Sequence, residues 1–272
     1  MPIDLTALID HHAQLPKYRQ LAASLREAID DGRLTPGEEL PSEAEMMEGT
    51  GLSRGSIRDA LGILESEALI VKRSGAATRV RDTPPQRPID AERYGRTLRL
   101  LKSGEPHPLT SAFTEHHGIS WPQYTVDAHV TKEPATAEDA RRLLLPEGSD
   151  LLRRRFVKYA KGQPMELQRS AIPWKLAGGT PLIDPGQQPW PGGTIAELFS
   201  LGLEVTRVTH DAEARMPRDD ERKALRMETP GPVISMVRVF WVGERPVEAS
   251  RVISPGDRAV LHYEVELDLS EG

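Results

Sequence analysis

Two arginines lie four positions apart in a stretch whose neighbouring residues are mostly small, LSRGSIRDALGILESEALI (residues 52–70). If this stretch is a helix, Arg54 and Arg58 share one face, because residues four apart lie one above the other. A guanidinium group can bind a phosphate or the edge of a guanine through two hydrogen bonds at once. Such a face suits close approach to a flat and negatively charged surface.

Small polar residues around the two arginines could assist the same contact. Ser53 and Ser56 can donate hydrogen bonds to a phosphate near the positive end of the helix, and Gly55 lets a backbone come close. We expect Arg54, near the helix start, to contact a base edge and Arg58, one turn later, to contact a phosphate. The alternative is a solvated arginine face without a partner.

The charge pattern predicts a local basic surface on an acidic protein. The chain has 272 residues and a formal net charge of −6. Residues 53–81 hold six basic and three acidic side chains, a net charge of 6 − 3 = +3. A basic segment inside an acidic chain is more informative about nucleic-acid binding than a diffuse excess of charge.

The composition excludes several classes of protein and site. The chain has no cysteine, so disulfides, thiolate metal sites and cysteine nucleophiles are excluded, which fits a reducing compartment. No apolar run approaches the roughly 20 residues of a membrane helix, and we expect a cytoplasmic protein without a membrane partner. Histidine pairs at 11–12 and 116–117 lack metal-ligand spacing, and no catalytic motif is present. We therefore expect no metal, no cofactor and no catalytic residues.

Three helices and a hairpin are predicted in the first 82 residues. Apolar residues at helical spacing predict a helix from Lys17 to about Asp31. Ser42 and Glu45 form a capping box at the start of a second helix, and Ser53 caps the third. The extended segments LIVKR and TRVR, separated by SGAA, predict a β-hairpin. This order of elements indicates a winged helix-turn-helix.

The hairpin and the second helix offer further candidate contacts. Lys72, Arg73 and Gly75 lie on the predicted hairpin, and such wings commonly contact phosphates or the minor groove. Charges that protect a sheet edge are the alternative. Ser42 is first a helix cap and second a candidate phosphate contact.

The remaining chain is organised as a linker and a second domain. Residues 83–98 begin Pro-rich and polar, so we interpret them as a linker between domains at 1–82 and 99–272. The second domain contains an internal repeat, in which residues 136–173 resemble residues 218–255 at an offset of 218 − 136 = 82. Two such halves are expected to pair their strands in one antiparallel sheet, with a ligand cleft between them.

Polar side chains of the second domain are candidates for ligand binding. The run RRR alternates sides if it lies on a strand, so Arg155 and Lys158 occupy opposite faces unless a bulge intervenes. Gln168 and Glu248 could accept hydrogen bonds, and Thr194 starts a predicted helix after two glycines. If these five residues converge in the cleft, they bind a small polar, anionic metabolite. Ion pairs with neighbouring residues and ordinary helix capping are the alternatives.

These motifs together resemble a known family. PKYRQLA, GRLTPGEELPSEAEM, GLSRGSIRDAL and ILESEALI, within residues 16–81, resemble the DNA-binding domain of the GntR family of bacterial transcription regulators. GQPMELQRSAIP, PGGTIAELF, GPVISMVRVFWVGERPVEAS and YEVEL resemble the UTRA effector domain of its HutC-like branch. The resemblance implies an α+β protein, a winged helix-turn-helix joined to an antiparallel-sheet effector domain of chorismate lyase-like fold.

The resemblance also implies a function. It indicates a ligand-responsive repressor that binds a near-palindromic DNA operator as a homodimer. A ligand-independent regulator of a plasmid or mobile element, whose second domain only dimerises, is one alternative, and an enzyme of the chorismate lyase type is another. Relatives that bind sugar phosphates have an Arg-x-Arg pair and an acidic residue where this chain has Phe156, Lys158 and Gln168. A different ligand is therefore expected.

Overall fold

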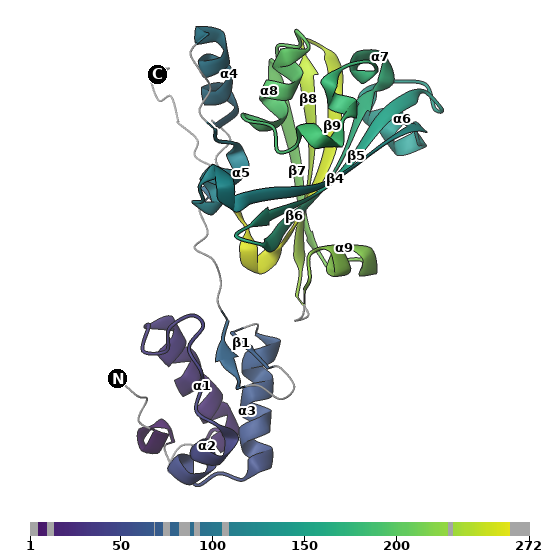
Figure 1. Cartoon of the computed structure of the whole chain (residues 1–272). Helices are drawn as coiled ribbons and strands as arrows, with labels where there is room; N and C mark the ends of the chain where they lie inside the picture. Colours follow the sequence, from purple (N-terminus) through teal and green to yellow (C-terminus); the bar gives the residue numbers. More distant parts are fainter. Residues whose placement is uncertain are drawn as a thin grey trace, which may run out of the picture. The chain divides into compact units, whose positions relative to one another are not determined.

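The structure is a computed structural model, and its described residues are 5–9, 14–67, 69–72, 77–81, 88–89, 93–104, 109–227 and 231–261. They form two compact units, one ending at residue 81 and one beginning at residue 88 (Figure 1). The first unit consists of three α-helices, a short 3-10 helix and a hairpin. Their bounds are η1 (Leu5–Leu8), α1 (Lys17–Asp30), α2 (Glu43–Thr50), α3 (Arg54–Ser66), β1 (Ile70–Val71) and β2 (Arg79–Val80).

Capping side chains set the starts of α2 and α3. The Ser42 hydroxyl accepts a hydrogen bond from the Glu45 backbone N–H, and the Glu45 carboxylate accepts one from the Ser42 N–H. Ser53 caps α3 by accepting from the backbone N–H of Ser56. Gly51 ends α2 with φ of 70°, a left-handed conformation that favours glycine. The capping residues and the helix boundaries predicted for this unit are thus confirmed.

The core of the first unit is the apolar stripe predicted from helical spacing. α1 and α3 pack against each other, and β1 pairs with β2 in an antiparallel hairpin. The largest fully buried side chains of this core come from all three helices and the hairpin: Leu21, Leu25, Met46, Ile57, Leu64 and Ile70. These contacts define a winged helix-turn-helix.

The second unit is built on a six-stranded antiparallel sheet with the strand order β4-β5-β6-β9-β8-β7. Its strands are β4 (Tyr124–Pro134), β5 (Asp150–Ala160), β6 (Gln163–Pro173), β7 (Arg207–Arg215), β8 (Val233–Val242) and β9 (Arg245–Pro255). Its helices are α4 (Arg93–Ser103), α5 (Ala112–His117), α6 (Ala137–Leu143), α7 (Trp174–Ala177), α8 (Gly193–Ser200) and α9 (Asp219–Ala224). Short 3-10 helices are η2 (Trp121–Gln123), η3 (Pro181–Ile183), η4 (Pro185–Gln187) and η5 (Gly256–Arg258).

The two faces of the sheet are covered by different helices. On one face, Leu143 of α6 and Leu225, directly after α9, belong to apolar clusters with the strands. On the other face, α7 and α8 contribute Ala177 and Leu198 to separate clusters. We call these the α6/α9 face and the α8 face. Because side chains alternate along a strand, neighbouring residues of β5 belong to different faces.

The sequence repeat corresponds to a structural repeat. Each half contributes a helix and a strand hairpin, α6 with β5–β6 and α9 with β8–β9, and the halves join where β6 pairs with β9. The helix starts match as well. The backbone N–H of Thr136 donates to the Asp139 carboxylate, and that of Arg218 donates to the Glu221 carboxylate, at positions related by 218 − 136 = 221 − 139 = 82.

The expected linker is partly structured within the second unit. Residues 88–89 form β3 (Pro88–Ile89), which pairs in parallel with β10 (Val260–Leu261). α4 begins at Arg93 and packs on α8, and the Tyr94 ring meets the Phe240 ring edge-on at 5.9 Å. The described residues after 92 therefore belong to the second unit.

Candidate DNA-recognition helix and ligand site

The predicted arginine face is present on α3. The Arg54 and Arg58 side chains are 61% and 64% exposed, whereas Ile57 and Leu64 on the opposite side of the helix are fully buried. The apolar side attaches α3 to the core, and the two guanidinium groups remain accessible. The helix can thus present both arginines to a nucleic acid without rearranging its packing.

A glutamate of α2 contacts both arginines, and no short-range pattern in the sequence predicts this contact. The Glu43 carboxylate accepts a hydrogen bond from Arg58 Nε at 3.0 Å and lies 3.7 Å from Arg54 Nε. All three side chains are at least one third exposed, so each ion pair contributes little to stability. A DNA phosphate placed at the arginines would compete with this carboxylate.

The small residues of α3 are not required by the fold. A Cβ atom added at Gly55 would meet only the Ser53 hydroxyl, at 3.8 Å, and one added at Gly62 would meet nothing within 4 Å. Neither glycine has positive φ, yet glycine in a helix interior costs about 1 kcal/mol relative to alanine. Their small size is consistent with close approach of a partner to this helix.

The DNA contacts predicted for the serines and for the hairpin are not equally covered by the structure. Ser42, Ser53 and Ser56 are occupied in capping, with 3.0 Å between the Ser53 and Ser56 hydroxyl oxygens, and whether they also contact phosphate stays a prediction. Arg73 and Gly75 lie outside the described residues. Lys72, at the hairpin base, forms an ion pair of 3.1 Å with Glu65.

The α8 face of the second unit holds a buried charged network centred on Arg154. This side chain donates from Nη1 to Glu197 at 3.0 Å, from Nη2 to Glu248 at 3.3 Å and from Nε to the Ser170 hydroxyl at 3.0 Å. The Arg154 and Glu248 side chains have no exposed surface. Burial raises the pKa of Glu248, while the Arg154 guanidinium opposes this rise.

A second buried ion pair lies on the same face. Lys158 Nζ is 3.4 Å from a carboxylate oxygen of Glu166. Burial would raise the pKa of Glu166, but the charges of Lys158 and His117 lower it to about 2. Burial also lowers the pKa of Lys158. Lys158 is thus already paired, and an anionic ligand would have to share it with Glu166.

Unpaired polar groups are buried close to these ion pairs in the sheet. Gln168 is only 2% exposed, and its amide forms no hydrogen bond with any described residue. Glu248 Oε2, Ser250 Oγ and Arg238 Nε also lack hydrogen-bond partners. Buried polar groups without partners are rare and costly, so they indicate a site for water or for a ligand. Ser250 lies opposite Ser170, and Gln168 lies two residues along β6.

The predicted convergence of five ligand residues is only partly found. Lys158, Gln168 and Glu248 share the α8 face. Thr194 lies in the first turn of α8 and does not cap it, since Gly192 occupies the cap position. Arg155 is on the opposite, α6/α9 face. The irregularity in β5 falls between Lys158 and Tyr159, so it does not alter the alternation of side chains between Arg155 and Lys158. The prediction of a single cleft that contains all five residues is therefore wrong.

Sequence reasoning missed Arg154, the centre of the network. The alternation of the RRR run could have placed it on the face opposite Arg153 and Arg155, but its partners lie 43 and 94 positions away in the sequence. Glu248 forms its ion pair with Arg154, 94 positions away, and not with a neighbouring residue. Within the described part of the chain, no group of three His, Asp or Glu side chains is arranged to hold a metal ion.

Comparisons with protein families give the same two domains. The family described as "Bacterial regulatory proteins, gntR family" matches residues 17–80, and the UTRA domain matches residues 126–259. The chain belongs to the GntR family of transcription regulators and carries a UTRA domain. It is thus a transcription regulator and not an enzyme of the chorismate lyase type.

Individual relatives match over most of their length. An HTH-type transcriptional regulator of Streptomyces coelicolor is 29% identical over 254 residues, 93% of either chain. The histidine utilization repressor of Pseudomonas putida is 26% identical over 243 residues, 89% of either chain. A crystal structure assigned to the GntR family is 27% identical, with a TM-score of 0.60, and covers 94% of this chain and 99% of its own.

Proposed function

We propose that the protein is a repressor that binds a near-palindromic operator as a homodimer and responds to a small polar metabolite. The observation that carries the DNA-binding part is the accessible pair Arg54 and Arg58 on a capped helix of a winged helix-turn-helix. In this proposal Arg54, in the first turn, contacts a guanine and Arg58, one turn later, contacts a phosphate. The P. putida relative is named as a repressor, which supports repression rather than activation.

The dimer follows from the small size of one recognition unit. A single winged helix contacts few base pairs, and two-fold pairing of identical chains is the commonest way to extend such a site. A symmetric dimer requires an operator with matching two-fold symmetry. We assign the dimer contacts to residues 99–272, whose sheet offers the edge strands β4 and β7. Such a regulator acts where the bacterial chromosome is, in the cytoplasm.

We place the effector on the α8 face. Lys158 could bind an anionic group, and the unpaired amide of Gln168 and the free oxygen of Glu248 could bind hydroxyl or amine groups. Thr194 and the backbone N–H groups at the start of α8 are further candidate contacts. The ligand would alter operator binding only to the extent that it binds one arrangement of the dimer more tightly than another.

A ligand-independent regulator is the second candidate. The observation that favours it is the set of ion pairs Arg154–Glu197, Arg154–Glu248 and Lys158–Glu166, which already neutralise the charges of the α8 face. A thermal-shift screen of small carboxylates, amino acids and phosphorylated metabolites separates the two. The main proposal expects a hit that also changes operator affinity, whereas the alternative expects none.

The effector site is tested with a variant of a residue that the fold does not pair. Gln168→Leu removes the unbonded amide while keeping a buried side chain of similar size. We expect it to abolish the response to the effector and to leave operator affinity unchanged. Arg141→Gln, on the exposed surface of α6, serves as the control. A normal response in the Gln168 variant would place the effector elsewhere.

A further inference from the structure

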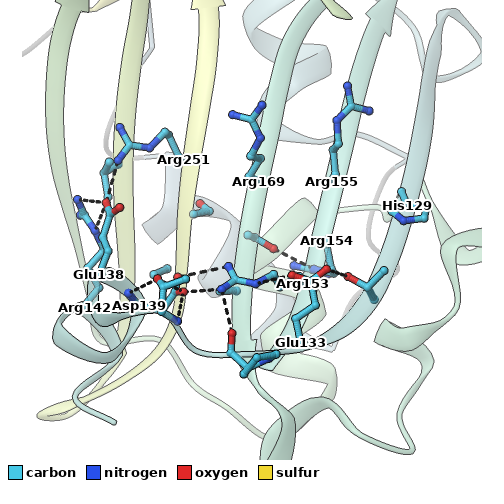
Figure 2. A pocket seen from close by; sticks show the side chains of 18 of the residues that line it. His129, Glu133, Glu138, Asp139, Arg142, Arg153, Arg154, Arg155, Arg169 and Arg251 are labelled. Atoms are coloured by element: carbon cyan, nitrogen blue, oxygen red, sulfur yellow. Dashed lines mark hydrogen bonds and ion pairs between the residues drawn. The ribbon is translucent and has the colours of Figure 1, made fainter. Parts of the chain in front are cut away.

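Three arginines and a histidine stand directly opposite one another on four adjacent strands of the α6/α9 face. In register across the sheet, His129 of β4 pairs with Arg155 of β5, Arg155 with Arg169 of β6, and Arg169 with Arg251 of β9. We call Arg155, Arg169 and Arg251 the arginine row. Figure 2 shows Arg155 and Arg169 side by side, with Arg251 on the next strand.

Two of the three arginines, Arg169 and Arg251, are each neutralised by an acidic residue of a helix. Arg251 forms an ion pair of 2.9 Å with Glu138 of α6, and Arg169 forms one of 2.5 Å with Asp220 of α9. These pairs are repeat-related, because 251 − 169 = 220 − 138 = 82, and each joins a helix of one half to a strand of the other. Two of the three arginines thus link the two halves of the domain through ion pairs.

Arg155 has no such structural role. It is exposed and forms neither an ion pair nor a hydrogen bond with any described residue. Like charges directly opposite on neighbouring strands destabilise their pairing, and Arg155 directly faces Arg169. Folding alone therefore gives no reason for a positive charge at this position, whereas an anion bound between Arg155 and Arg169 would offset their repulsion.

The arginine row lies in a cavity of ligand size. The cavity has a volume of about 820 Å³, within the range of small-molecule sites. Glu138, Asp139 and Arg142 of α6 line it (Figure 2), and α9 contributes Asp220. Adjacent strands are roughly 4.8 Å apart. A molecule with two anionic groups at a similar separation could thus contact two guanidinium groups of the row at once, each with the paired hydrogen bonds that guanidinium forms with carboxylate or phosphate.

We propose that the arginine row binds a small, multiply charged oxyanion, on the face of the sheet opposite the effector site proposed above. The ligand is a polycarboxylate or a phosphate-bearing metabolite, and Arg155 is its principal contact. Arg169 shares its guanidinium between the ligand and Asp220. This site does not depend on the residues of the α8 face, so the two proposals can be tested independently.

The test is calorimetric titration of the full chain, without DNA, with citrate, pyrophosphate and acetate at matched ionic strength. We expect citrate or pyrophosphate to bind at least tenfold more tightly than acetate, and the better of the two identifies a carboxylate or a phosphate source. Arg155→Gln should weaken that binding at least tenfold. Arg141→Gln, an exposed arginine of α6 outside the cavity lining, and Gln168→Leu, on the α8 face, should leave it unchanged.

Several results would overturn the inference. Equal affinity for all three anions, or equal losses in the Arg155 and Arg141 variants, would mean that only general charge attraction is present. Loss of binding in Gln168→Leu would move the anion to the α8 face and leave the effector proposal intact. A change of oligomeric state in Arg155→Gln, measured by light scattering without ligand, would make the arginine row a contact between subunits.

Discussion

Replacement of Arg154 by methionine is expected to destabilise the second unit strongly. The change keeps a long apolar side chain and removes the guanidinium that pairs with Glu197 and Glu248. Both carboxylates would then be buried without their ion-pair partner, since the side chain of Glu197 is only 4% exposed and that of Glu248 has no exposed surface. Removing one partner of a buried ion pair typically costs about 3–5 kcal/mol.

This cost is large against the total stability of a domain. Native domains are stable by about 5–15 kcal/mol, and for 150–250 residues each kcal/mol shifts the melting temperature by roughly 2–4 °C. We therefore expect the second unit of Arg154→Met to melt roughly 6–20 °C lower than the parent. Arg155→Met is the matched control, because this neighbouring side chain lies on the opposite face without an ion pair. Its expected change is within about 0.5 kcal/mol.

Tryptophan fluorescence isolates the relevant unit. All four tryptophans, Trp121, Trp174, Trp190 and Trp241, lie in the second unit. Urea or thermal unfolding monitored with excitation at 295 nm thus reports on this unit in the intact chain, while circular dichroism reports on both. Similar stability of the Arg154 and Arg155 variants would refute the assignment of Arg154 as the charge that stabilises this face.

The same variant has a defined pH dependence. The pKa of folded Glu248 is already raised by burial, and Arg154 is the largest of the influences that limit the rise, ahead of Arg238. Without Arg154 this pKa rises further. A carboxyl group with a raised folded pKa binds more protons in the folded state, so stability falls as pH rises through that pKa. We expect the deficit of Arg154→Met to be smaller at pH 5 than at pH 7.5, and a deficit independent of pH would contradict this reasoning.

Three further predictions concern the other charged contacts. Arg58→Ala should weaken binding to all DNA sequences and reduce the slope of log affinity against log salt by about one, measured by fluorescence anisotropy. Glu43→Gln should strengthen DNA binding several-fold by freeing both arginines of α3, and weaker binding would mean that Glu43 positions them instead. Since Glu166 has a folded pKa of about 2, its stabilising contribution is present above about 4.5 and is lost as pH falls toward 2. Lys158→Met should remove this contribution, so that acid unfolding of the variant shows a smaller loss of stability over that range.

Local features of the fold could be predicted from the sequence. Ser42 and Ser53 cap helices through contacts three residues away, and the apolar stripe of α3 follows from helical spacing alone. The repeat at 82 residues likewise predicted the antiparallel sheet. These features depend on short-range patterns or on internal similarity, which a single sequence contains.

The ligand-binding region could be predicted only in part. Strand alternation placed Arg155 and Lys158 on opposite faces, but which face α8 covers depends on distant contacts such as Arg154–Glu197 and Arg154–Glu248. The same holds for Glu43, whose contact with Arg58 joins α2 to α3 across the turn. The arginine row required the pairing of β5, β6 and β9, which alternation within one strand does not give.

Selection of binding sites from random DNA tests the central claim most directly, when it is done in parallel with the parent chain and Arg54→Ala. The account predicts that the parent enriches a near-palindromic sequence. It predicts that the variant loses preference at one position in each half-site, with an affinity loss there of about 1–3 kcal/mol. Failure of the parent to enrich any sequence, or enrichment of the same sequence by both proteins, would contradict the assignment of α3 as the DNA-reading helix.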